Sequence, residues 1–145
     1  SLRRQRQMCI RDSMSPTLGV IEIGACFLPE MQRTRAATEA VFLMLDYAMT
    51  ELRYRRMQWR CNAQHHRSRN AAARLGFRYE GILYNHMILK GRSRDTACYS
   101  ILDTDWPEVR KIFNAWLADD NFDAKGVAQS SLSEQMRERP VAPRG

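Results

Sequence analysis

The residues best suited to chemistry lie between Gln32 and Thr38, where an apolar stretch gives way to small residues. Ala36 and Ala37 follow Arg33 and Arg35 and open a run of strong helix formers. The first turn of a helix leaves about four backbone N–H groups without partners, and the helix dipole adds partial positive charge there. Small side chains let an anion reach these amides, and arginines add charge-assisted bonds. The pattern indicates a diphosphate site; an ordinary loop that enters a helix is the alternative.

Two strands and a helix must position this segment. Val20 to Leu28 is mostly apolar and predicts a strand, in which Gly24 indicates a bulge and which Pro29 ends. Residues 36–52 carry apolar side chains at helical spacing, which predicts a helix packed on a sheet. Arg56 to Cys61 alternates between polar and apolar residues and predicts a second strand. The two strands and the helix between them form a βαβ-like crossover.

A second helix and a hairpin are expected next. Ser68 is a candidate N-cap for a helix over about Arg69 to Leu75, with Gly76 in the left-handed stop position. The segments Ile82 to Leu89 and Thr96 to Leu102 predict two strands joined by a turn over 90–94. The predicted fold class is therefore α/β, a mixed sheet with flanking helices.

A last helix is expected to begin near Asp105, and beyond Asn121 the composition becomes polar. We divide the chain into a basic segment over 1–13, a folded domain over 14–122 and a loosely ordered tail over 123–145. The first segment has no helical or strand period and is interpreted as non-native or disordered; a native basic extension is the alternative.

Composition excludes several classes of protein. No run of about 18 apolar residues occurs, so we expect no membrane span. The formal net charge of +7 raises the possibility of nucleic-acid binding, but the arginines are scattered without interleaved aromatic residues. Adjacent His65 and His66 lack distant ligands at metal spacing, so we predict no metal site. The four cysteines are widely spaced and are interpreted as free thiols in a cytoplasmic protein: Cys9, Cys26, Cys61 and Cys98.

Several motifs, in the right order, resemble those of the GNAT superfamily of N-acetyltransferases. Gln32 to Ala37, followed by Thr38-Glu39-Ala40, is similar to the coenzyme A signature of that family. Ser68 to Phe77 resembles its second helix with the Leu-Gly-Phe ending. The branch that includes ribosomal-protein alanine and serine N-acetyltransferases is matched by Glu80-Gly81, Asp95 and Asp105-Trp106-Pro107.

The resemblance implies acetyl-CoA as co-substrate and a direct transfer of acetyl to an amine, either a protein N-terminus or a small molecule. It places the pantetheine arm on the first strand and the diphosphate on the helix start. The implied coenzyme-binding residues are Cys26, Phe27, Leu28, Gln32, Arg33, Thr34, Arg35, Ala36, Ala37, Thr38, His65 and Ser68.

Catalytic roles are carried by few residues. Glu22 is the candidate general base, with a polar position on the wet face of a strand as the alternative. A backbone N–H near Cys26 and Phe27 is the candidate oxyanion donor. Ser68 is the nearest substitute for a general acid, and a plain N-cap is the favoured alternative.

Some positions depart from the family pattern. Arg35 replaces the first glycine of the signature, so its side chain must turn away or contact a phosphate. His65 replaces an asparagine that contacts pantetheine, and Ala72 replaces the general-acid tyrosine. Family members also have strands and helices before the segment at Val20, so we expect a fragment.

Two alternatives to an active enzyme follow: a coenzyme-binding fragment without turnover, or a basic RNA- or ribosome-associated module. An open sheet edge in such a fragment favours a homodimer.

Overall fold

The computed structural model describes residues 14–23 and 33–144. Five strands form one mixed sheet in the order β1-β2-β3-β5-β4. The strands are β1 (Met14–Ser15), β2 (Val20–Glu22), β3 (Arg56–Asn62), β4 (Arg78–Leu89) and β5 (Arg92–Leu102). β2 and β3 run parallel and the other neighbours run antiparallel. This arrangement confirms the predicted mixed sheet and the crossover between its first two long segments.

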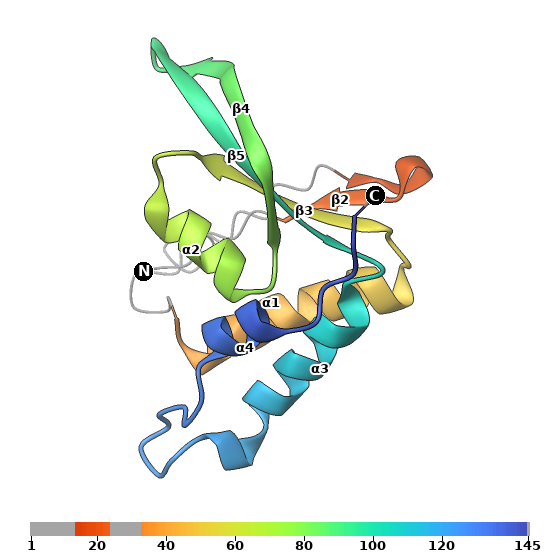
Figure 1. Cartoon of the computed structure of the whole chain (residues 1–145), viewed down its shortest axis with the longest axis vertical. Coiled ribbons are helices and arrows are strands. Elements are labelled where there is room, and N and C mark those ends of the chain that lie inside the picture. The colour runs from red at the N-terminus through yellow and green to blue at the C-terminus, as the bar shows by residue number, and fades with distance from the viewer. Residues whose placement is uncertain (1–13, 24–32, 145) are drawn as a thin grey trace, which may run out of the picture.

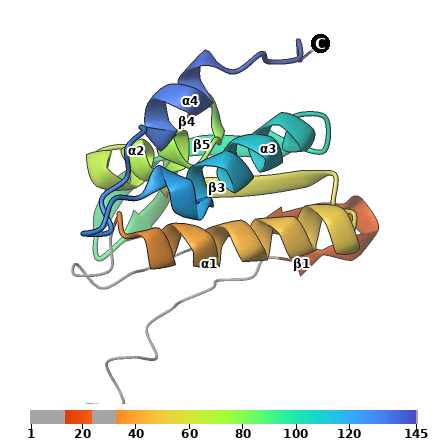
Figure 2. The ribbon, with the colours of Figure 1, turned by 90° about the horizontal axis from the view of Figure 1, so that it is seen from below.

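Four α-helices surround the sheet. They are α1 (Arg35–Asp46), α2 (His66–Arg74), α3 (Trp106–Leu117) and α4 (Leu132–Glu138). Short 3-10 helices form η1 (Pro16–Leu18) and η4 (Asp119–Asn121), and the π-helical turn η3 (Tyr47–Glu51) continues α1. Figure 2 shows α1 along one side of the molecule and α2, α3 and α4 grouped on the other.

The core follows from the alternation in β3. Met57, Trp59 and Cys61 are buried, and they pair across the sheet with buried residues of β5. The same core includes apolar side chains of the helices, among them Val41, Leu45 and Phe113. The polar residues of β3 lie on the opposite face, where ion pairs connect neighbouring strands.

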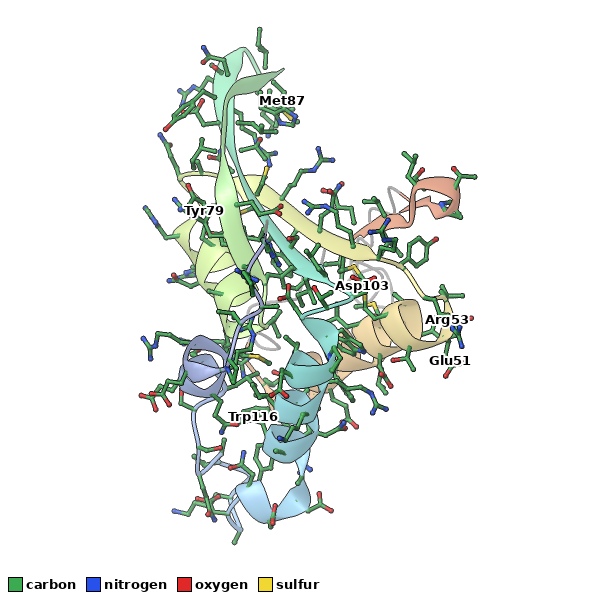
Figure 3. All side chains as sticks on the ribbon, turned by 45° about the vertical axis from the view of Figure 1, so that its right-hand side comes forward. Glu51, Arg53, Tyr79, Met87, Asp103 and Trp116 are labelled. Atoms are coloured by element: carbon green, nitrogen blue, oxygen red, sulfur yellow. The ribbon has the colours of Figure 1, made fainter. Side chains whose placement is uncertain are left out.

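The hairpin of β4 and β5 projects beyond the rest of the molecule (Figure 1). Its turn is shorter than the predicted 90–94, because Lys90 and Gly91 both adopt positive φ, 51° and 75°. A two-residue turn of this kind matches the twist of the flanking strands. Figure 3 shows Met87 on the projecting part and Tyr79 near its base.

The predicted cap of the second helix is wrong. α2 begins at His66, two residues before Ser68, and its N-cap is His65. The Nδ1 atom of His65 accepts a hydrogen bond from the backbone N–H of Ser68 over 3.1 Å, so an imidazole replaces the expected hydroxyl. At the other end, Gly76 has φ 91°, which confirms its left-handed position.

The segment after Asn121 differs from the expected loose tail, because residues 132–138 form α4. Leu132 and Met136, one turn apart, are 2% and 1% exposed and belong to the core. A Cβ atom at Gly76 would lie 3.0 Å from Met136 Sδ, so α4 packs directly on the end of α2. A seven-residue helix with two apolar side chains has too weak a period to stand out against its polar neighbours.

Candidate functional site

The first turn of α1 has the geometry that an anion site needs. Thr34 is the N-cap, and its Oγ1 accepts a hydrogen bond from the N–H of Ala37 over 3.1 Å. The N–H of Thr38 donates to the carbonyl of Thr34. Within the described part of the chain, no acceptor is recorded for the amides of Arg35 and Ala36, and the Ala36 side chain is exposed. Two backbone donors therefore remain available at the positive end of the helix dipole.

Arg35 turns away from this site, which is one of the two orientations expected for it. Its guanidinium donates to the carbonyl of Leu117 over 2.8 Å and to Asp119 over 2.6 Å. It also lies 4.1 Å from the ring centroid of Phe122. The side chain thus connects the start of α1 to the end of α3 and leaves the helix start open.

Arg74, which the sequence analysis did not single out, replaces Arg35 at the site. From the last turn of α2, its guanidinium donates to Thr38 Oγ1 over 3.0 Å and lies 5.2 Å from the ring centroid of Trp116. Burial lowers the pKa of Arg74, and the nearby charge of Arg33 lowers it further. The sequence offered only an arginine at a helix C-terminus, which the helix dipole explains by itself.

A cavity of about 1080 Å³ opens between the start of α1, one side of α2, and α4. Its walls include Ala37 and Thr38 from α1, Ser68 from α2 and Trp59 from β3. Six of the lining residues are arginines: Arg33, Arg67, Arg74, Arg78, Arg137 and Arg139. None of the described lining residues is acidic. Such a cavity favours a ligand with several negative charges.

His65 and Ser68 line the same cavity near the start of α2. Ser68 Oγ accepts a hydrogen bond from the indole N–H of Trp59 over 3.1 Å. Because that indole group is a donor only, the hydroxyl of Ser68 keeps its own proton to donate. Ala72, the position of the family's tyrosine, is fully buried in the core and presents no polar group to the cavity.

Glu22 lies outside this cavity, on the polar face of the sheet. Its carboxylate accepts two hydrogen bonds from Arg60, over 3.0 and 2.6 Å. The Glu22 side chain is 16% exposed, and the pairing raises the pKa of Arg60. Glu22 is therefore fixed in orientation at the end of β2, directly before residues 24–32.

The structure thus brings together some of the predicted residues. Arg33, Ala37, Thr38, His65 and Ser68 line one cavity, whereas Thr34 caps the helix beside it. Cys26, Phe27, Leu28 and Gln32 lie outside the described residues, and so does the predicted oxyanion donor.

Two further searches bear on the kind of protein. In the ranges 14–23 and 33–144, no group of three metal-binding side chains is close enough to hold a metal ion. None of the helices in the same ranges has the length and apolar character needed to cross a membrane.

The sequence itself identifies the family. Residues 6–78, about half of the chain, match the family described as acetyltransferase (GNAT) domain. The chain belongs to the GNAT family. No curated protein sequence matches it.

Solved structures agree with the GNAT assignment. A GCN5-related N-acetyltransferase from Brucella melitensis is 46% identical, with a TM-score of 0.82 over 86% of this chain and 57% of that one. A probable GNAT-family acetyltransferase from Chromobacterium violaceum is 49% identical, with a TM-score of 0.63 over 66% and 48% of the two chains. For an acetyltransferase of T. thermophilus, described only by that activity, the values are 31%, 0.69, 73% and 57%. The GNAT chain studied here therefore spans about half the length of these relatives.

Proposed function

We propose that this GNAT chain binds acetyl-CoA, with the diphosphate on the first turn of α1. The observation that carries the proposal is the shared cavity of Arg33, Arg74 and the amides that open α1, in which no described lining residue is acidic. Arg74 is largely buried and no ion pair is recorded for it among the described residues. A diphosphate at this place neutralises both arginines and satisfies the free amides.

We further infer that the chain transfers acetyl to a primary amine. The relative from Brucella melitensis is described as an N-acetyltransferase, which supports this reaction type. The resemblance to the ribosomal-protein branch favours a protein N-terminus, and the chemistry agrees. An α-amino group has a pKa of about 8 and is partly neutral at pH 7, whereas lysine, at about 10.4, needs stronger activation.

In the proposed mechanism, positioning of the two substrates contributes most of the rate. Glu22 receives the proton of the amine, directly or through a water molecule. Its two hydrogen bonds from Arg60 support this role because they hold an ionised carboxylate in one orientation. Ser68, whose hydroxyl keeps a free proton, is the candidate donor to the leaving thiolate. The oxyanion donor near Cys26 and Phe27 stays a prediction.

A second candidate function is coenzyme binding without turnover. Two observations favour it: the chain spans about half of its relatives, and buried Ala72 replaces the tyrosine of the family pattern. The expected homodimer also stays a prediction, and sedimentation velocity measures it directly.

One experiment separates the two functions. The melting temperature is recorded with and without acetyl-CoA, and acetyl transfer to a panel of peptide N-termini and polyamines is followed by mass spectrometry. Stabilisation with transfer supports the enzyme, and stabilisation without transfer supports the binding fragment. No stabilisation at saturating acetyl-CoA contradicts both.

A further inference from the structure

Three arginines of the cavity have no recorded hydrogen bond or ion pair within residues 14–23 and 33–144: Arg33, Arg67 and Arg137. The other three are occupied. Arg78 pairs with Asp105, Arg139 donates to the carbonyl of Gly76, and Arg74 donates to Thr38. The three unoccupied arginines come from three separate elements, so they do not form a single cluster.

Arg137 stands out because α4 holds it rigidly. Leu132 and Met136, on the same short helix, are almost completely buried. Arg139, directly after the helix, fixes it to the carbonyl of Gly76 over 2.8 Å. Figures 1 and 2 both show α4 beside the N-terminal turn of α1. Ser133, one turn before Arg137, lines the same cavity, so the two side chains share one face of α4.

The proposed ligand carries a phosphate that the start of α1 does not explain. Coenzyme A has a diphosphate and, on its ribose, a separate 3′-phosphate. The diphosphate is accounted for by Arg33, Arg74 and the helix amides. A phosphate monoester has a charge of about −1.5 to −2 at pH 7 and three strong acceptor oxygens. Arginine is the side chain that best binds such a group, through two parallel hydrogen bonds.

Arg67 fits this phosphate less well than Arg137 does. It lies seven residues before Arg74 on α2, which is roughly 10 Å along the helix axis. Its neighbours His65 and Ser68 are the residues expected to contact the uncharged pantetheine arm. Arg137 lies on another wall of the cavity, beside the helix start that the diphosphate occupies.

We infer that Arg137, with Ser133, binds the ribose 3′-phosphate of the coenzyme, so that α4 selects coenzyme A over its 3′-dephospho form. This inference rests on the proposed function. It gives the helix after Asn121 a part in ligand selection in addition to its part in the core.

The test compares the affinities of coenzyme A and 3′-dephospho-coenzyme A by calorimetry at fixed ionic strength. We expect the unaltered chain to bind coenzyme A about tenfold more tightly. Arg137→Gln should remove most of this preference by weakening coenzyme A alone, and Ser133→Ala should remove part of it. Arg92→Gln, an exposed arginine on the hairpin turn, is the matched control and should leave both affinities unchanged.

Each outcome decides one question. Equal affinities in the unaltered chain overturn the inference and leave the proposed function standing. A preference that survives Arg137→Gln, or a loss that affects both ligands equally, also overturns it. If neither ligand binds the unaltered chain, the proposed function fails as well. Melting curves without ligand verify that each variant is folded.

Discussion

The guanidinium of Arg74 donates a hydrogen bond to Thr38 Oγ1 over 3.0 Å and thereby joins the end of α2 to the start of α1. The two residues are 36 positions apart in the sequence. Their contact places a largely buried cation beside the open amides of α1, where a diphosphate would complete the set of charges.

Replacing Arg74 tests this relationship. We expect Arg74→Gln to weaken acetyl-CoA binding by about tenfold, because one charge-assisted contact to the diphosphate is lost. Calorimetry or a melting-temperature shift measures the change. Arg92→Gln serves as the control, since Arg92 is exposed on the hairpin. Unchanged affinity in Arg74→Gln would show that the diphosphate lies elsewhere.

Glu22→Gln tests the proposed base. We expect the rate of acetyl transfer to fall by about a hundredfold, the usual contribution of a general base, with less than about a twofold change in acetyl-CoA affinity. Initial rates and calorimetry measure the two quantities separately.

The chain offers a matched control for this change. Glu80 also accepts two hydrogen bonds from an arginine, Arg56, and it lies near the same polar face of the sheet. Glu80→Gln should therefore retain the rate of acetyl transfer. Equal losses in both variants would indicate a structural effect instead of base catalysis.

Asp105 makes stability depend on acid pH. Burial alone would raise the pKa of Asp105, but hydrogen bonds from Arg144, the Leu102 N–H and Arg78 lower it below its ordinary value. The carboxylate therefore stabilises the fold above its unfolded pKa of about 3.9, and this contribution is lost as the pH falls through the lower folded value.

Asp105→Asn should follow that dependence. At pH 7 we expect it to destabilise the fold by about 3 kcal/mol, because two arginines lose a buried partner. Near pH 3 and below, the difference from the unaltered chain should shrink. Urea unfolding across this range measures it, with exposed Asp120→Asn as the control. A difference that does not vary with pH would contradict the assignment.

Leu132→Ala tests the contribution of α4 to the core. Leu132 is 2% exposed, so we expect a loss of about 3 kcal/mol and a melting temperature lower by roughly 6–12 °C. Val127→Ala, at a side chain that is 59% exposed, should change stability by less than about 0.5 kcal/mol. Similar melting curves for both variants would mean that α4 is not part of the folded core.

Much of the fold could be predicted because its signals are local. Alternation from Arg56 to Cys61 specified a strand, and Gly76 specified where α2 ends. The cap at His65 was missed because imidazole is not among the usual capping groups, although its Nδ1 accepts a hydrogen bond as a hydroxyl does. Helix α4 was missed because its two buried residues give little local signal.

The sequence by itself determined the family, the order of the strands and helices, and the helix start at Thr34, since each depends on neighbouring residues. Only the tertiary structure decided which cations face the cavity. It turned Arg35 toward Asp119, brought Arg74 to Thr38 and placed Arg137 on another wall of the same cavity. The physical reason is that charge at a site depends on distances between elements remote in the chain, and local spacing does not contain those distances.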